Sequence, residues 1–395
     1  MRILLLTFYF KPDLSAGSFR AAALVDAIVK QLPENGSIDV ITSLPNRYKT
    51  FSVDAPEIEN SGAVTIHRVP VAAHKSGLLD QSRSFLEFSR SVFRLVANKD
   101  YDLIFATSSR LMTAVLAAAI SSRKKTPLYL DIRDIFVDTI GDVLPIYLSL
   151  ITRPLFGFME RFAIKRAAKV NLVSPGFEQY FSSRYKDKHF SFFTNGIDDE
   201  FIEVSRCKAT SKTASRGVLK VLYAGNIGEG QGLHEILPEL AARMYGKLFF
   251  QLFGDGGRKE ILKSRLESRQ IDNVVLSPPL SRDELIKEYQ DADVLFLHLN
   301  DYDAFRKVLP SKIFEYAAVG KPIWAGIAGY SAEFVRSEIS NAAVFNPCDS
   351  DDAVQSFDSL TLEYRYREKF IAKYGRREIM EKMAQEMINL LKEEN

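Results

Sequence analysis

The strongest constraint on the fold is an alternation of apolar runs and helical stretches that occurs twice along the chain. Residues 3–10 form a continuous apolar and aromatic run, which is typical of a strand covered on both faces in a parallel sheet. Further strands are predicted at residues 38–42, 64–71, 103–107, 128–131 and 170–173, with helical patterns between them. This alternation predicts a doubly wound α/β domain.

The alternation begins again after a polar stretch, residues 199–216, which has no apolar period and is interpreted as a linker. New strands are predicted at residues 219–223, 248–253, 274–277, 294–299 and 343–346, and the chain is predicted to be helical from residue 351 onward. A length of 395 residues suits two such domains. We therefore expect an N-terminal domain (1–198), a linker (199–216), a C-terminal domain (217–375) and a last helix (376–395) that packs back on the N-terminal domain.

Composition narrows the class of protein. An apolar content of 46% and a charged content of 26% are those of a soluble globular protein. A formal charge of +2 gives no sign of nucleic-acid binding. Cys207 and Cys348 show no metal-ligand spacing, and no apolar run reaches the roughly 18–20 residues of a spanning helix. These features predict a reduced, cytoplasmic protein.

One stretch, residues 305–326, has the pattern of an anion site. Pro310 disfavours helix before it, Ser311 is a suitable N-cap, and residues 312–319 read as a short helix closed by Gly320. The first turn of a helix offers unpaired N–H groups and a positive dipole end, and Lys312 lies beside them. The stretch is thus suited to a diphosphate, although an ordinary capped helix in a sheet protein has the same pattern.

Several motifs together carry a family resemblance. They are Tyr223-Ala-Gly-Asn-Ile-Gly-Glu-Gly-Gln-Gly232, Phe253-Gly-Asp-Gly-Gly257, Asn195-Gly-Ile-Asp198, the stretch ending in Glu315, Phe10-Lys-Pro-Asp-Leu-Ser-Ala-Gly-Ser18 and Asp131-Ile-Arg-Asp134. In this order the chain resembles the retaining glycosyltransferases of family 4, in the branch that builds bacterial surface polysaccharides. The resemblance implies the GT-B fold, with two Rossmann-like domains facing a central cleft. It also implies an acceptor on the first domain and a nucleotide sugar on the second.

The resemblance also implies roles for single residues. Glu315 would bind the ribose hydroxyls, while Pro310, Ser311 and Lys312 would hold the pyrophosphate. The other donor-binding positions would be Gly225, Gly228 and Gly254, where backbone approaches the phosphates, and Ser277, Pro278 and Leu280, which would line the base. Gly17, Ser18 and Arg20 would face the phosphates or the acceptor from the first domain.

The chain departs from the family pattern at three positions. Lys307 stands where many members have a second glutamate that contacts the sugar, and Asn226 and Gln231 stand where many have an arginine and a lysine. We interpret these changes as linked, because cations from residues 306–312 would replace the charge missing from the other loop. Arg306 and Lys307 as plain solvated surface residues remain the alternative.

The chemistry implied by the resemblance needs few groups. A retaining transfer without a covalent intermediate requires positioning, stabilisation of the leaving phosphate and exclusion of water. In relatives, the position of Asp134 lies near the donor sugar; the alternative is that Asp134 caps the segment after the strand. Arg133 would contact a phosphate or the acceptor; the alternative is that it pairs with Asp131 and Asp134. Asp301-Tyr-Asp303 lacks further ligands for a hard cation, so neither a metal nor another cofactor is expected.

A membrane contact is suggested by residues 144–169, which mix aromatic and aliphatic side chains with five cations and one acid. This pattern fits an interfacial helix on anionic lipid, and an amphipathic helix facing its own core is the alternative.

Together with the family resemblance, the sequence implies a metal-independent glycosyltransferase that uses a nucleotide sugar, UDP favoured, and a saccharide or polyprenyl-linked acceptor. The rivals are an epimerase or hydrolase of UDP-sugars with this fold and a non-catalytic nucleotide-sugar-binding subunit.

Overall fold

The computed structural model describes residues 1–45, 54–71, 78–108, 110–138, 146–206 and 217–393. The chain divides into two compact units. The N-terminal unit comprises Met1–Asn195 and Arg376–Asn395, and the C-terminal unit comprises Gly196–Gly375. The last helix therefore belongs with the beginning of the chain.

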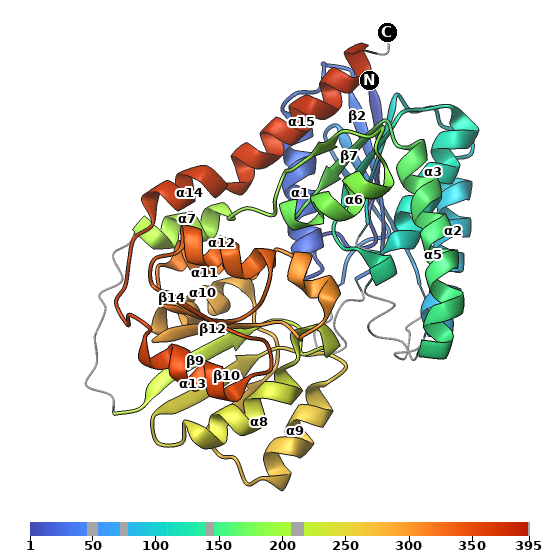
Figure 1. Cartoon of the computed structure of the whole chain (residues 1–395). Coiled ribbons are helices and arrows are strands. Elements are labelled where there is room, and N and C mark those ends of the chain that lie inside the picture. Colours follow the sequence, from blue (N-terminus) through green and yellow to red (C-terminus); the bar gives the residue numbers. More distant parts are fainter. Residues whose placement is uncertain (46–53, 72–77, 109, 139–145, 207–216, 394–395) are drawn as a thin grey trace. The chain divides into compact units, whose positions relative to one another are not determined.

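The N-terminal unit, coloured blue to green with the red last helix in Figure 1, is built on an eight-stranded sheet of order β3-β4-β2-β1-β5-β6-β7-β8. Its strands are parallel except β3, which runs antiparallel to β4. They are β1 Arg2–Leu6, β2 Ser37–Ser43, β3 Ile58–Ser61, β4 Val64–Val69, β5 Leu103–Thr107, β6 Leu128–Ile132, β7 Lys169–Leu172 and β8 Phe190–Ser191. Central strands such as β5 and β6 are buried along their whole length, as their continuous apolar sequences predict.

Helices cover this sheet. They are α1 Ala16–Val29, α2 Leu78–Val96, α3 Leu111–Lys124, α5 Ile146–Arg166, α6 Glu178–Arg184 and α15 Arg376–Glu393, with a short η1 at Pro175–Phe177. Helix α15 packs against α1, and Met380, Met383 and Met387 are fully buried in the core they share with the sheet. The methionine stripe is thus a packing surface, as its helical spacing indicates.

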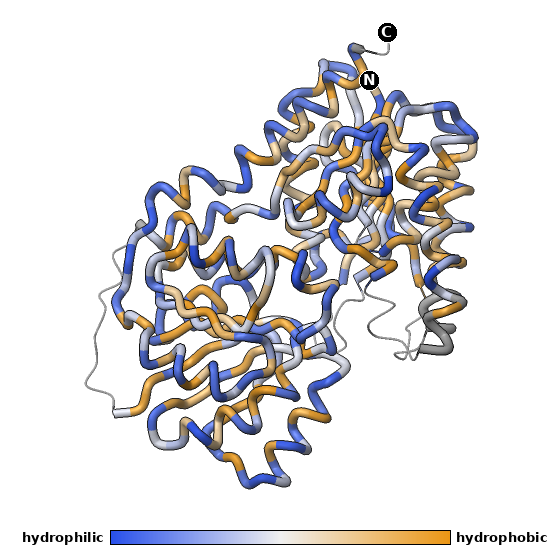
Figure 2. Tube along the Cα trace, viewed as in Figure 1, coloured by the Kyte–Doolittle hydropathy of each residue, from blue (hydrophilic) through white to orange (hydrophobic). Residues whose placement is uncertain are grey.

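The C-terminal unit has a six-stranded parallel sheet of order β11-β10-β9-β12-β13-β14. Its strands are β9 Leu219–Ala224, β10 Leu248–Phe253, β11 Val274–Ser277, β12 Val294–His298, β13 Ile323–Gly326 and β14 Ala342–Phe345. Its helices are α7 Asp199–Arg206, α8 Leu233–Arg243, α9 Lys259–Ser268, α10 Arg282–Asp291, α11 Lys312–Val319, α12 Tyr330–Glu338, α13 Ser350–Asp358 and α14 Glu368–Tyr374, with η2 Glu229–Gln231 and η3 Asp303–Lys307. In Figure 2 the strands of both units are coloured mostly as hydrophobic.

Three details differ from the sequence predictions. Residues 199–206 are helix α7 and not linker, because Phe201 is fully buried among the core residues of the C-terminal unit; residues 207–216 lie outside the described part. Strand β1 ends at Leu6, four residues before the end of its apolar run. The chain after residue 351 is not continuously helical, since residues 359–367 separate α13 from α14.

None of the helices in the described ranges is long and apolar enough to cross a bilayer.

A buried ion pair joins distant parts of the N-terminal unit and gives a stability prediction. Arg20 of α1 bonds both carboxylate oxygens of Asp131 on β6, at 2.8 and 2.9 Å, and both side chains are at most 2% exposed. Asp131→Ala leaves a buried guanidinium without its carboxylate, so we expect a loss of about 3–5 kcal/mol in the unfolding free energy of this unit. Urea unfolding followed by far-ultraviolet circular dichroism measures this loss.

Two controls make the test specific. The only tryptophan, Trp324, lies in the core of the C-terminal unit, so its fluorescence transition should keep its midpoint in the variant. Arg83→Gln removes an exposed pair with Glu87 and should cost at most about 1 kcal/mol. An unchanged dichroism transition in Asp131→Ala would contradict the structural role of the pair.

Candidate functional site

Helix α11 has the predicted bounds, Lys312–Val319, and Gly320 closes it in the left-handed conformation with φ +83°. Ser311 precedes the helix but has helical φ and ψ, and its side chain makes no capping hydrogen bond. The prediction of a Ser311 cap is therefore wrong, because the turn begins one residue earlier through Ile313 N–H donating to the Pro310 carbonyl. The hydroxyl of Ser311 is not used to cap the helix.

The Lys312 side chain lies directly on the loop that follows β9. A Cβ added to Gly225 would stand 2.2 Å from Lys312 Nζ and 2.6 Å from its Cε, and Gly225 has φ +140°. The ammonium is also 5.0 Å from the centroid of the Tyr223 ring. Only glycine at position 225 permits this approach, so α11 and the end of β9 are adapted to each other.

The same loop carries the two neutral residues that replace the expected cations. Asn226 Nδ2 donates to Gln231 Oε1 at 2.7 Å, and a Cβ on Gly228 would lie 2.4 Å from Asn226 Nδ2. The acid of the loop, Glu229, accepts hydrogen bonds from Arg258 and Tyr302. The loop therefore offers amide groups, while Lys312 supplies positive charge at its surface.

A buried histidine holds this loop from behind. His298, fully buried at the end of β12, has its Nδ1 2.7 Å from the Gln231 carbonyl, and its Nε2 accepts from the Cys348 N–H at 3.0 Å. Because Nε2 is an acceptor, Nδ1 carries the proton and donates. Burial lowers the pKa of His298 to about 4, so the ring is neutral and fixes the Gln231 end of the loop.

The remaining donor residues gather at the carboxyl edge of the same sheet. Gly254 follows β10, and its added Cβ would stand 1.9 Å from the Gly225 carbonyl oxygen. Its N–H donates to the Ser277 carbonyl at the end of β11, where Pro278 and Leu280 follow. In a parallel sheet this edge is where ligands bind. The C-terminal unit thus brings together Gly225, Gly228, Gly254, Asn226, Gln231, Ser277 and Lys312, with Glu315 one turn along α11.

The segment 301–307 only partly supports the idea of relocated charge. Arg306 is about half exposed and pairs with Asp301 at 3.1 Å and Asp303 at 3.5 Å. Its charge is therefore balanced within its own loop. Both carboxylates of the Asp-Tyr-Asp motif are ion-pair partners of Arg306. Lys307 ends η3 and is half-buried. Lys312, and not Arg306, is the cation placed on the loop that follows β9.

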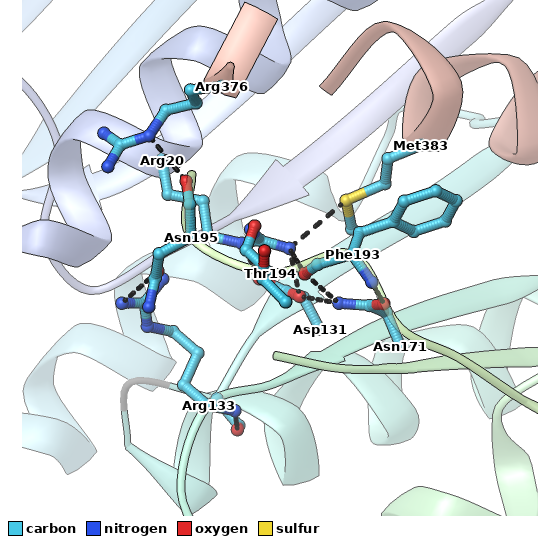
Figure 3. Close-up of polar contacts among 10 residues, drawn as sticks. Arg20, Asp131, Arg133, Asn171, Phe193, Thr194, Asn195, Arg376 and Met383 are labelled. Carbon is cyan, nitrogen blue, oxygen red and sulfur yellow. Dashed lines mark hydrogen bonds and ion pairs between the residues drawn. The ribbon is translucent and has the colours of Figure 1, made fainter. Parts of the chain in front are cut away.

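In the N-terminal unit, Arg20 has a different role from the one predicted. Besides Asp131, its guanidinium donates to the backbone carbonyls of Phe193 and Thr194, so it ties α1 to β6 and to the segment after β8 (Figure 3). The hydroxyl of Ser18, in the first turn of α1, is fully buried. The Arg20 guanidinium is hydrogen-bonded within the unit, and the Ser18 hydroxyl is enclosed in it. The expectation that these two side chains face a phosphate is therefore wrong.

Arg133 lies near the start of α1. A Cβ on Gly17 would stand 3.9 Å from Arg133 Nε, and Nη2 donates to Asn195 Oδ1 at 3.3 Å. Asp131 pairs with Arg20 and not with Arg133, which corrects the predicted pairing. Burial lowers the pKa of Arg133 to about 10, and the nearby Arg20 and Arg376 act in the same direction. Figure 3 shows the three arginines gathered around Thr194 and Asn195; Asp134, the next residue, is exposed.

The described residues contain no group of three or more His, Cys, Asp or Glu side chains arranged to hold a metal ion. No role was predicted from the sequence for Arg376 in the N-terminal unit or for Arg282 in the C-terminal unit. The sequence also did not predict that His298 holds the loop after β9. Only His298 had a local signal, since it ends a buried strand that leads into the site.

Comparison with known proteins agrees with this architecture. Residues 210–377 match the family model of glycosyl transferases group 1, and residues 22–188 match that of the glycosyl transferase 4-like domain. A 101-residue segment is 37% identical to WcaI of Escherichia coli, which is named a glycosyl transferase of colanic acid biosynthesis. That match covers 25% of this chain and 24% of WcaI.

Solved structures share the fold at low identity. Sucrose-phosphate synthase from Thermosynechococcus elongatus has a TM-score of 0.76 at 14% identity, over 99% of both chains. Anabaena HepE in complex with UDP has a TM-score of 0.61 at 16% identity, over 98% of this chain and all of that one. Two Rossmann-like units with parallel sheets define the GT-B glycosyltransferase fold. This chain belongs to the glycosyltransferases, with a glycosyl transferase 4-like domain followed by a group 1 domain, and it has the GT-B fold.

The contact of Lys312 with Gly225 gives a prediction with a matched control. Gly225→Ala places a methyl group where the ammonium lies, so Lys312 must leave the loop. We expect UDP affinity, measured by calorimetry, to fall roughly 10–100-fold, the size of a lost charge-assisted hydrogen bond. Gly246→Ala also replaces a glycine of positive φ, +74°, but no atom lies within 4 Å of the new methyl group, and the variant should keep wild-type affinity. Equal affinities in the two variants would exclude a role for the contact in binding.

Proposed function

We propose that this chain is a retaining, metal-independent glycosyltransferase that transfers a hexose or N-acetylhexosamine from a UDP-sugar. The acceptor is a saccharide or a lipid-linked saccharide in surface polysaccharide biosynthesis, used at the cytoplasmic face of the membrane. The observation that carries the proposal is the placement of the Lys312 ammonium on Gly225, at the N-terminus of α11 and one turn before Glu315. The partial match to WcaI supports the polysaccharide pathway.

The chemistry follows from these groups. As the bond between sugar C1 and the diphosphate oxygen breaks, negative charge grows on the leaving phosphate. Lys312 and the dipole of α11 stabilise that charge. The acceptor oxygen then bonds to C1 on the same face, and its proton passes to the leaving phosphate. Glu315 holds the ribose in the C-terminal unit, and Asp134 and Arg133 of the N-terminal unit are the proposed contacts of the acceptor. Positioning, more than covalent chemistry, supplies the rate enhancement.

Glu315→Ala tests the ribose assignment. The variant loses a carboxylate that accepts from two hydroxyls, so we expect UDP affinity to fall at least about tenfold and transfer to become undetectable. A thermal-shift series with UDP, GDP and their sugars on the wild type and the variant measures this loss, because ligand binding raises the melting temperature. Near-normal donor affinity in Glu315→Ala would refute the assignment.

The reaction products distinguish the proposed transferase from an epimerase, a hydrolase and a non-catalytic subunit. Incubating the bound UDP-sugar without acceptor should leave it intact, whereas an epimerase or a hydrolase would alter the sugar. A non-catalytic subunit, suggested by Lys307 in place of the usual glutamate, would bind donor and turn over with none of a panel of lipid-linked acceptors.

The membrane part of the proposal rests on α5. Its side chains Leu150, Leu155, Phe158 and Phe162 are 72, 50, 72 and 38% exposed, although they are large and apolar. At 100° per residue they share one side of the helix with the exposed Arg161 and Lys165. The only acid of the helix, Glu160, is buried against Tyr180 and Tyr185. An apolar face with only positive charge suits anionic lipid headgroups.

Vesicle binding tests this surface. Leu155→Ser/Phe158→Ser should lose sedimentation with phosphatidylcholine vesicles that contain phosphatidylglycerol, and the wild type should bind them less at high salt. Tyr245→Ser removes an equally exposed aromatic side chain, 65% exposed, from the C-terminal unit and should bind like the wild type. Vesicle binding that is the same in all three proteins would rule out α5 as the contact.

A further inference from the structure

Tyr223 is a buried tyrosine near the end of β9 to which the proposed mechanism gives no role. It is the residue before Ala224, the last residue of the strand, and only 1% of it is exposed. It belongs to the core of the C-terminal unit, together with Ile227 and Leu252. A phenylalanine would fill the same core volume, so the hydroxyl and the surroundings of the ring show what a tyrosine adds here.

The hydroxyl of Tyr223 fixes the loop that follows the strand. It donates to the Asn226 carbonyl at 2.6 Å. The N–H of the same peptide group belongs to Ile227, and it donates to the Asp255 carbonyl at 2.9 Å. Both sides of this peptide are therefore bonded within the unit. Its carbonyl oxygen, which has partial negative charge, is held by the tyrosine and cannot turn toward a bound anion.

Two further carbonyls of this loop are held in the same way. Asn300 Nδ2 donates to the Glu229 carbonyl at 3.0 Å, and His298 Nδ1 donates to the Gln231 carbonyl at 2.7 Å. The carbonyls of residues 226, 229 and 231 are thus all bonded to side chains of the C-terminal unit. A loop held in this way offers amide groups to an anion and keeps these carbonyl oxygens from it.

The ring of Tyr223 contacts the cation of the site. Lys312 Nζ lies 5.0 Å from the ring centroid. The position that a Cβ of Gly225 would take is 2.2 Å from Lys312 Nζ and 3.7 Å from the Tyr223 hydroxyl oxygen. The ammonium and the hydroxyl therefore border the same space, which Gly225 leaves open. An ammonium near an aromatic face is attracted by the negative charge of that face.

A second tyrosine attaches the helix to the strand. Tyr316 lies four residues after Lys312, about one turn along α11, and its hydroxyl accepts from the Ala224 N–H at 3.4 Å. Tyr316 is fully buried. The face of α11 that carries Lys312 is therefore tied to the end of β9, and the lysine side chain extends from a fixed backbone.

We propose that Tyr223 is a positioning residue for the donor diphosphate: its ring holds the Lys312 ammonium at the loop, and its hydroxyl holds the Asn226 carbonyl away from the ligand. A lysine ammonium lies at the end of a flexible stem, and ordering that stem upon binding costs affinity. The ring orders it before the donor arrives. The inference rests on the proposed binding of the diphosphate by Lys312.

Two substitutions distinguish the ring from the hydroxyl. Tyr223→Leu removes both, and UDP affinity measured by calorimetry should fall roughly 10–30-fold. Tyr223→Phe keeps the ring and should lose roughly 3–10-fold, because the Asn226 carbonyl is released. Tyr364→Phe is the matched control, since it removes a tyrosine hydroxyl that donates to the Ser205 carbonyl at 3.1 Å in the same unit. It should bind UDP like the wild type.

A double-mutant cycle distinguishes positioning of Lys312 from loss of core packing. The contribution of the ring is the difference in UDP affinity between Tyr223→Leu and Tyr223→Phe. Beside Lys312→Met this difference should disappear, because the ring then has no ammonium to hold. A ring contribution of zero in the otherwise wild-type chain, or one that persists beside Lys312→Met, would overturn the proposal. Wild-type UDP affinity in either Tyr223 variant would do the same.

The fluorescence of Trp324, in the core of the same unit, checks that each variant folds. If Tyr223→Leu does not fold, Tyr223→Phe decides. Wild-type UDP affinity in it overturns the proposal, and a loss that Tyr364→Phe does not share supports it. Absence of UDP and GDP binding in the wild type would instead refute the proposed function.

Discussion

The C-terminal unit depends on one close approach, that of the Lys312 ammonium to the backbone of Gly225. It joins the N-terminus of α11 to the loop after β9, and it is possible only because position 225 has no side chain. Gly254 approaches the carbonyl of Gly225 from β10 in the same way. Two glycines and one lysine therefore bring three strand ends and a helix N-terminus to one point. Backbone amides, a dipole and a cation meet there, which is the combination that binds a diphosphate.

The placement of Lys312 also gives a physical meaning to the departures from the family pattern. Asn226 and Gln231 bond to each other, so their neutral amides keep the shape of the loop. His298 fixes that loop from behind as a neutral ring. Positive charge comes from another helix, while Arg306, which the sequence suggested as a second source, is neutralised by Asp301 and Asp303.

Sequence patterns predicted the elements that local physics specifies. The continuous apolar runs located strands such as β5 and β10 to the residue, and Pro310 with Gly320 delimited α11. The short β13 was missed because Pro322 precedes it and Gly326 is its last residue, so the segment has the pattern of a loop. Helix α7 was missed because its apolar residues Phe201, Ile202 and Val204 open a long polar stretch, and their packing in the assembled unit is what stabilises the helix.

Long-range pairing accounts for the other differences. Arg20 and Asp131 are 111 residues apart, and Arg282 and Asp198 are 84 apart. No periodicity or propensity links such positions, so sequence reasoning assigned Arg20 to a ligand and left Arg282 without a role. The glycines, the lysine and the glutamate proposed for the donor site could be named from the sequence because they lie within short motifs.

The central claim is that Lys312 supplies the charge that holds the donor diphosphate, without a metal ion. Calorimetric titration of UDP into the wild type and Lys312→Met, each with EDTA and then with Mg²⁺, tests it most directly. We expect equal wild-type affinity in the two buffers and a loss of roughly 10–100-fold in Lys312→Met. Wild-type binding that requires Mg²⁺, or unchanged affinity in Lys312→Met, would contradict it.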